Sequence, residues 1–187
     1  MNQDIFSRYE SDSRKRLAID VSVGRIEELF EDFDSAASYV KKDLDQDFVD
    51  YLIDSVREIG RHDFVIRIHL PVLVPEKHRE RVRKSIKSYF MYLELLERRK
   101  LGKMLGRSSL LFLFGMLLLA LSMFLKGNIE HVTGVMKELI TEGLTVAAWV
   151  SLWSAFAGLI FELGRIISNI RLFRRIASRE VVFKERE

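Results

Sequence analysis

Two long stretches of the chain contain no ionisable residue. Residues 108–125 read SSLLFLFGMLLLALSMFL, and residues 143–161 read GLTVAAWVSLWSAFAGLIF. A helix of 18 residues rises about 27 Å, which is close to the ~30 Å thickness of a hydrocarbon core. Neither stretch has the polar stripe of a helix on the surface of a soluble domain. We therefore predict an α-helical transmembrane hairpin with spans at 108–125 and 143–162.

Basic residues gather on one side of both predicted spans. Those before the first span are Arg98, Arg99, Lys100, Lys103 and Arg107, and those after the second are Arg165, Arg171, Arg174, Arg175 and Arg179. The intervening segment, 126–142, has only Lys126 and Lys137. Lys and Arg next to a span are retained on the cytoplasmic side during insertion. The pattern predicts that both termini are cytoplasmic and that 126–142 is an extracytoplasmic loop.

The predicted loop has an amphipathic pattern of its own. Its apolar residues at helical spacing are Ile129, Val132, Val135, Met136, Leu139 and Ile140. Two interpretations fit this pattern equally: a helix that lies on the outer leaflet, or a helical cap over the hairpin.

Small residues repeat along the second span. Ala147, Ser151 and Ala155 recur every four residues, and Ser154 with Gly158 gives a parallel small-xxx-small stripe. Small side chains let two helix backbones approach closely where lipid provides no hydrophobic drive. This seam packs either on the first span of the same chain or on another subunit, and the sequence leaves both possibilities open.

The region before the spans alternates strand and helix patterns. Residues 17–23, LAIDVSV, and 64–70, FVIRIHL, predict β-strands. Between them we predict a short acidic turn at 25–33 and an amphipathic helix that starts within 41–47, where Asp43 and Gln46 have capping-box spacing. The predicted apolar face of this helix consists of Leu44, Phe48, Tyr51, Leu52, Ser55, Val56 and Ile59. A strand, helix and strand of these lengths predict a right-handed crossover with parallel strands.

A long helix is predicted from Glu76 toward the first span, with Gly102 and Gly106 as weak points. Two strands are too few for a stable sheet, so either residues 180–184, EVVFK, add a strand or strands pair between chains. The predicted fold class is an α+β cytoplasmic domain joined to the two-span hairpin. Its parts are a flexible tail at 1–16, an α/β domain with a basic juxtamembrane helix at 17–107, the hairpin, and a basic C-terminal helix and tail at 163–187.

Charge is unevenly distributed in the predicted cytoplasmic domain. Residues 25–63 hold five basic and twelve acidic residues, net −7, whereas residues 76–107 hold eleven basic and four acidic residues, net +7. The overall net charge of +3 is too small to indicate nucleic-acid binding. Anionic headgroups attract basic residues near a membrane by about 1 kcal/mol each. The predicted membrane-surface contacts are Arg98, Arg99, Lys100, Lys103, Arg107, Arg171, Arg174 and Arg175.

The chain offers few groups for catalysis or metal binding. It has no cysteine, which excludes thiol nucleophiles, disulfides and cysteine-based metal centres. Asp43, Asp45 and Asp47 have the spacing of a calcium loop, but Phe48 stands where such a loop requires Gly. We therefore predict no metal and no cofactor.

The histidines are scattered along the sequence. Only His69 has a conceivable acid–base partner, in Asp20 or Asp63, and nothing in the spacing requires either pair. The sequence contains none of the common catalytic motifs, which favours a protein that is not an enzyme.

Three segments resemble an uncharacterised family of small bacterial membrane proteins. They are LFEDFD at 29–34, KKDLDQDFVDYL at 41–52 and FVIRIHLP at 64–71, while Asp34-Ser-Ala-Ala stands where the family has Asp-Pro-Ser-Pro. The resemblance implies a cytoplasmic amino-terminal domain, two spans and a location in the bacterial inner membrane. It implies no activity.

These observations favour a membrane-anchored, non-enzymatic assembly or adaptor protein that acts as an oligomer or as an accessory subunit. The expected partners are anionic lipid headgroups and a second copy of the chain or another membrane protein. Two alternatives remain. One is a component of an oligomeric transporter or channel, which needs polar residues on a shared axis, and the other is a membrane-associated enzyme with a pocket around His69.

Overall fold

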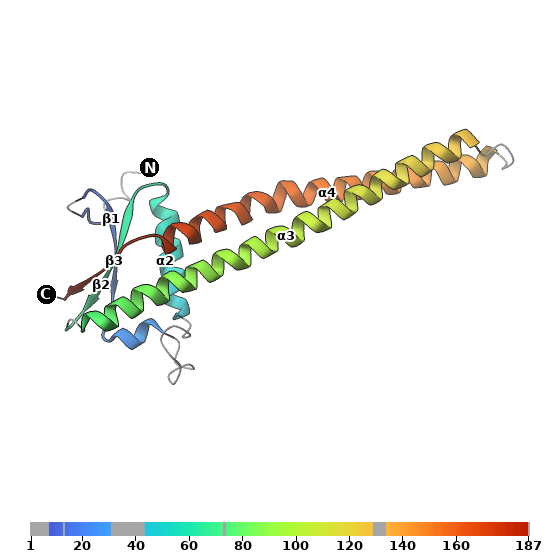
Figure 1. Cartoon of the computed structure of the whole chain (residues 1–187). Helices are drawn as coiled ribbons and strands as arrows, with labels where there is room; N and C mark the ends of the chain where they lie inside the picture. The colour runs from blue at the N-terminus through green and yellow to red at the C-terminus, as the bar shows by residue number, and fades with distance from the viewer. Residues whose placement is uncertain (1–7, 13, 31–43, 73, 129–133, 187) are drawn as a thin grey trace. The chain divides into compact units, whose positions relative to one another are not determined.

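A computed structural model describes residues 8–12, 14–30, 44–72, 74–128 and 134–186. Its elements in chain order (Figure 1) are β1 (Leu17–Ser22), a 3₁₀ turn η1 (Ile26–Leu29), α2 (Gln46–Ile59), β2 (Phe64–Leu70), α3 (Glu76–Asn128), α4 (Gly134–Ala177) and β3 (Val181–Glu185). The chain forms two compact units: unit 1 consists of Met1–Leu95 with Asn169–Glu187, and unit 2 consists of Leu96–Ser168. Both α3 and α4 contribute residues to each unit.

Unit 1 is built on a parallel sheet with the strand order β1-β2-β3. Leu17 pairs with Phe64, and Ile66 pairs with Val181. The strands predicted at 17–23 and 64–70 are therefore confirmed, as is their parallel pairing. The third strand comes from the C-terminal segment, so one chain completes the sheet by itself. Figure 1 shows β3 beside β2, although α3 and α4 separate them in the sequence.

The core of unit 1 lies on one face of this sheet. Phe64, Ile66, Ile68 and Leu70 alternate along β2 and are at most 1% exposed, as a period of two predicts for one buried face. Three helices supply the facing side chains, which include Phe48, Leu52 and Val56 of α2, Val82, Ile86 and Phe90 of α3, and Phe173 and Ile176 of α4. Complete burial of one such side chain contributes roughly 1.5–3 kcal/mol.

Helix α2 begins within the predicted range 41–47, but without the predicted capping box. Asp45 is its N-cap, and the Asp45 carboxylate accepts a hydrogen bond from the Phe48 N–H at 2.9 Å. Gln46 is the first helical residue, so it does not occupy the third position of a capping box. Asp43 lies outside the described residues. The predicted acidic turn at 25–33 is a single 3₁₀ turn in its described part.

The predicted apolar face of α2 is buried except at Tyr51, and Leu44, which is also buried, lies before the helix begins. Tyr51 is 47% exposed, and its hydroxyl donates a hydrogen bond to the Asp20 carbonyl oxygen at 3.0 Å. Val49 is buried and was not expected there. Tyr51 lies at the edge of the apolar stripe, where its ring contacts protein and its hydroxyl remains accessible.

The two long helices extend beyond the predicted spans. Helix α3 continues through Gly102 and Gly106, so neither glycine interrupts it. Helix α3 ends at Asn128 and α4 begins at Gly134, so most of the predicted loop at 126–142 belongs to the helices. No proline stands between 134 and 177 to break the helical pattern. The described part of the amphipathic segment, with Val135, Met136, Leu139 and Ile140, is therefore the start of α4 and not a separate element, whereas Ile129 and Val132 lie outside the described residues.

The described part of the predicted flexible tail contacts the sheet. The Ala18 N–H donates to the Glu10 carbonyl oxygen at 2.8 Å, and Ser11 forms an antiparallel bridge with Leu17. Residues 8–12 and 14–16 are thus held beside β1.

Candidate functional site

Small and hydroxyl-bearing side chains form the interface between α3 and α4 in unit 2. Among the described residues between 108 and 161, the buried ones are Ser108, Gly115 and Ser122 on α3, and Thr141, Ala148 and Ala155 on α4. Each set repeats every seven residues. A seven-residue repeat keeps one side of a helix turned toward its partner, and small side chains on that side allow close packing.

Helices α3 and α4 approach each other closely at Gly115. A Cβ atom added to Gly115 would lie 2.8 Å from Leu152 Cγ and 3.1 Å from the Ala148 carbonyl oxygen. A side chain at this position would therefore push the helices apart. A Cβ atom added to Gly106 meets nothing within 4 Å, so the requirement for glycine is local to the interface.

Hydrogen bonds connect the same two helices near the C-terminal end of α3 and the N-terminal end of α4. The buried Ser122 hydroxyl donates to the Thr141 carbonyl oxygen at 2.9 Å and lies 3.0 Å from the Thr145 hydroxyl. The Thr145 hydroxyl donates to the same carbonyl oxygen at 2.8 Å. These bonds satisfy polar groups that would otherwise be costly to bury.

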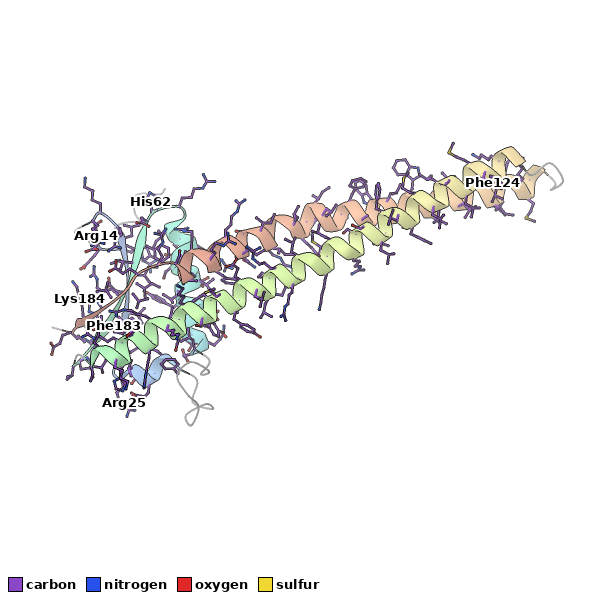
Figure 2. All side chains as sticks on the ribbon, in the orientation of Figure 1. Arg14, Arg25, His62, Phe124, Phe183 and Lys184 are labelled. Atoms are coloured by element: carbon purple, nitrogen blue, oxygen red, sulfur yellow. The ribbon has the colours of Figure 1, made fainter. Side chains whose placement is uncertain are left out.

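Large apolar side chains cover the outside of unit 2. Only 17% of the most apolar window of α3 and 11% of that of α4 is buried, whereas the core helix of a soluble protein is mostly buried. The exposed residues include Leu110, Leu113, Leu117, Phe124, Trp149, Trp153, Ile160 and Phe161, and Figure 2 labels Phe124 near the end of α3. By length and composition, both helices are able to cross a membrane.

The predicted seam residues fall on different sides of α4. Ala155 is buried at the interface with α3, whereas Ala147 and Ser154 are exposed and Ser151 and Gly158 are half-buried. The hydroxyls of Ser151 and Ser154 each donate to the carbonyl oxygen four residues earlier. Packing within the chain therefore follows the seven-residue repeat, and the four-residue repeat leaves Ala147 and Ser154 accessible.

A cavity of about 450 Å³ lies between α3 and α4 where the uncharged segment of α3 begins. Its cations are Lys100, Lys103 and Arg107. Glu162 of α4 is the one carboxylate that lines it. Small residues make this space, since a Cβ atom added to Gly158 would lie 3.3 Å from the Ser108 hydroxyl oxygen.

Two of the three cations at this cavity have no carboxylate partner within the described part of the chain. Lys100 Nζ lies 2.5 Å from Glu97 Oε1. Within the described part of the chain, neither Lys103 nor Arg107 forms an ion pair. Even with the Glu162 carboxylate counted, the cavity therefore carries an excess of positive charge at the end of an apolar segment.

A second cavity, of about 350 Å³, lies on the other side of the same helix interface, and Ser108 lines both cavities. Apart from Ser108 and Ser109, its walls are apolar and include Leu105, Phe112 and Phe156. The two phenyl rings meet edge to face with their centroids 6.3 Å apart. A polar space and an apolar space thus lie on opposite sides of the α3–α4 interface.

The predicted membrane-surface cations have different surroundings. Arg98, Arg99 and Arg171 are exposed. Arg174 Nη2 lies 2.9 Å from Glu94 Oε1, and the Arg175 guanidinium donates to the carbonyl oxygens of Gly60 and His62. Partial burial lowers the pKa of Arg175, and a neighbouring arginine lowers it further. Arg174 and Arg175 therefore hold α4 to the rest of unit 1.

The face of the sheet opposite the core carries a charged network. His69 Nε2 lies 2.8 Å from Asp20 Oδ1, and Arg67 Nη1 lies 3.3 Å from the same oxygen and 2.8 Å from Glu10 Oε2. The Arg67 hydrogen bond and charge lower the pKa of the Glu10 carboxyl. Of the two partners considered for His69, the structure brings it to Asp20 and not to Asp63.

This network has a structural explanation. Arg67 is 7% exposed, and its charge is shared by two carboxylates, one from the sheet and one from the amino-terminal segment. A buried guanidinium needs such partners. Among the described residues, no group of three His, Asp or Glu side chains is arranged to hold a metal ion.

A row of cations lies on the unit 1 part of α3. Lys77, Arg81, Lys84 and Lys87 are exposed, and their spacing of four, three and three places them on one side of the helix. Arg83 Nη1 instead lies 2.7 Å from Glu76 Oε1 and lowers the pKa of that carboxyl. Within the acidic segment 25–63, Asp54 pairs with Arg57, and Asp63 pairs with Arg179.

Sequence reasoning missed the side of the interface that α3 contributes. The signal was present as Ser108, Gly115 and Ser122, seven residues apart within an otherwise large and apolar segment. The spacing was visible, but its meaning depends on the matching repeat of α4.

Comparison with known proteins gave no match to a family model, to a curated protein or to a solved structure.

Proposed function

We propose that the protein is a membrane-anchored, non-enzymatic assembly or adaptor protein. In this proposal the helices of unit 2 cross a bilayer as a hairpin, and unit 1 lies in the cytoplasm. The observation that carries it is the distribution of side chains in unit 2, with small residues between the helices and large apolar residues outside. Water would oppose this arrangement, whereas lipid favours it.

The folding of unit 1 supports a location of both termini on the same side. β3 follows α4 and pairs with β2, which precedes α3. Both ends of the hairpin therefore return to one compact unit. The basic residues at these ends favour the cytoplasmic side, and the family resemblance favours a bacterial inner membrane.

The adaptor role is supported by surfaces that the fold leaves unused. The row formed by Lys77, Arg81, Lys84 and Lys87 is exposed and fits an acidic protein partner. Ala147 and Ser154 leave a small-residue strip on α4 for a second transmembrane helix. The hydroxyls of Ser122, Thr145, Ser151 and Ser154, in contrast, are paired within the hairpin and do not favour the transporter alternative.

The anchoring is tested by cysteine labelling, because the chain contains no cysteine. We expect a Gly127→Cys variant to react with a membrane-impermeant reagent in intact cells. Ser11→Cys and Ser178→Cys variants should react only after permeabilisation. Labelling of all three in intact cells, or release of the protein from membranes by alkaline carbonate, would contradict the proposal.

The assembly role is tested by measuring the mass of the complex in mild detergent. The wild-type protein should be larger than one chain, and an Arg81→Gln, Lys84→Gln, Lys87→Gln variant should lose a partner held by these charges. Salt well above ~0.15 M should have the same effect, because the screening length falls below ~8 Å. A monomer without partners at low salt would argue against an adaptor.

A further inference from the structure

We infer that the 450 Å³ cavity between α3 and α4 binds the phosphate group of an anionic phospholipid. This inference rests on the proposed membrane anchoring and adds a specific ligand to it.

The charges of the first cavity suit a phosphate. Lys103 and Arg107 line it without an ion pair in the described part of the chain, and Lys100 shares its charge with Glu97. A guanidinium matches two phosphate oxygens in a bidentate manner, and an ammonium adds a point charge. The Ser108 side chain lies at the same cavity and offers a hydroxyl donor.

The position of the cavity suits a lipid headgroup. The three cations lie within two helical turns before residue 108, where the uncharged segment of α3 begins. In the proposed orientation, this is the level of the inner-leaflet headgroups, and basic pockets between transmembrane helices at that level bind anionic headgroups. The volume is far above the ~30 Å³ share of a water molecule, so it has room for a phosphodiester.

The lining of the first cavity favours a phospholipid over a free phosphate ion. The apolar side chains of Met104 and Leu111 line it beside the cations. An acyl chain is the apolar continuation of a lipid phosphate, and free phosphate has none. Apolar surface buried there adds to the affinity.

Glu162 opposes the ligand and thereby provides a test with a defined sign. It is the one carboxylate at the cavity, so its charge repels a phosphate. Replacing it with the uncharged Gln should strengthen binding, which is the opposite of the effect of an ordinary substitution that damages a site.

The experiment uses the full-length protein in a neutral mild detergent, with bound lipid counted by native mass spectrometry. The probes are phosphatidylglycerol, phosphatidylcholine and inorganic phosphate. The site variant is Lys103→Gln with Arg107→Gln. The matched control is Arg99→Gln with Arg165→Gln, which removes two exposed charges from the same helices outside the cavity.

We expect one phosphatidylglycerol to bind and the site variant to weaken it about thirtyfold, since each cation near an anionic headgroup contributes a factor of about five. The control should change binding by less than about threefold, and Glu162→Gln should tighten it about fivefold. Equal losses in the site and control variants would overturn the inference, as would equal binding of phosphatidylcholine. Competition by inorganic phosphate at the concentration of the lipid would assign the site to a free phosphate and overturn the lipid assignment.

The failure of this site is distinguishable from failure of the anchoring. Before the lipid titration, membranes carrying each variant are extracted with alkaline carbonate. A protein that stays in the membrane but shows no selectivity for the anionic lipid contradicts the site alone. A wild-type protein that carbonate releases contradicts the anchoring on which the site depends.

Discussion

Unit 1 and the uncharged segments of unit 2 bury opposite kinds of side chain. In unit 1, Phe64 of the sheet and Phe90 of α3 are completely buried in the core between the sheet and three helices. A soluble domain is stabilised in the same way, by the removal of apolar surface from water. In unit 2, Gly115 and Ala148 lie inside and large residues such as Trp153 lie outside. The comparison teaches that a count of apolar residues does not describe this chain. What matters is on which side of each helix the large residues stand.

The largest expected effect is on unit 1. Phe90→Ala removes a buried ring whose centroid lies 6.3 Å from that of Phe173, and the cavity left behind should cost about 3–5 kcal/mol of unfolding free energy. Hydrogen exchange of the β2 amides in detergent should rise sharply while that of 108–125 stays slow. Tyr92→Ala on the exposed side of the same helix is the control. If Phe90→Ala reduced hydrogen-exchange protection equally in both units, a large buried side chain would not stabilise unit 1 selectively.

In unit 2 the opposite substitution should be the damaging one. Gly115→Leu inserts bulk where even an added Cβ atom would lie 2.8 Å from Leu152 Cγ. Overpacking of this kind should cost about 1–3 kcal/mol of stability. The readout is the melting temperature of the detergent-solubilised protein together with hydrogen exchange along 108–125.

The matched control is Gly106→Leu, at a position where an added Cβ atom meets nothing within 4 Å. This variant should leave the stability unchanged or raise it by up to about 1 kcal/mol through helix propensity. If both glycines tolerated leucine equally, the close approach of α3 and α4 would be wrong.

The smallest expected effect is a pH dependence confined to unit 1. Glu180 Oε2 lies 2.8 Å from Arg16 Nη1, and this hydrogen bond lowers the pKa of Glu180 below its ordinary value of 4.5. The folded protein thus binds fewer protons at this site than the unfolded chain. The resulting stability is present above pH 4.5 and is lost as the pH falls through the lowered pKa.

A Glu180→Gln variant should therefore melt slightly below the wild type at pH 7, and the two melting curves should converge toward pH 3. Glu185→Gln removes another β3 charge, one without an ion pair in the described part of the chain, and should leave the difference constant with pH. Convergence in that control as well would assign the effect to net charge.

The sequence by itself determined the elements that depend on local pattern. Residues 17–23 and 64–70 alternate with a period of two, and the uncharged segments extend for the length of a membrane span. Such signals depend only on neighbours along the chain, which is why both strands and both apolar helices were predicted near their observed positions. The cap of α2 was assigned to the wrong residue because three aspartates stand close together, and local pattern does not distinguish Asp45 from Asp43 as the cap.

Only the tertiary structure decided between alternatives that the sequence left open. Residues 180–184 are too short to specify a partner, and their pairing with β2 depends on where α4 ends. The second span carries both a four-residue and a seven-residue repeat of small residues. The seven-residue repeat faces α3 because Gly115 permits a close approach opposite Ala148. Likewise, Lys103 and Glu162 are far apart in sequence and share a cavity only because the helices pack antiparallel. Contacts of this kind depend on the simultaneous fit of two surfaces, which no pattern along one helix contains.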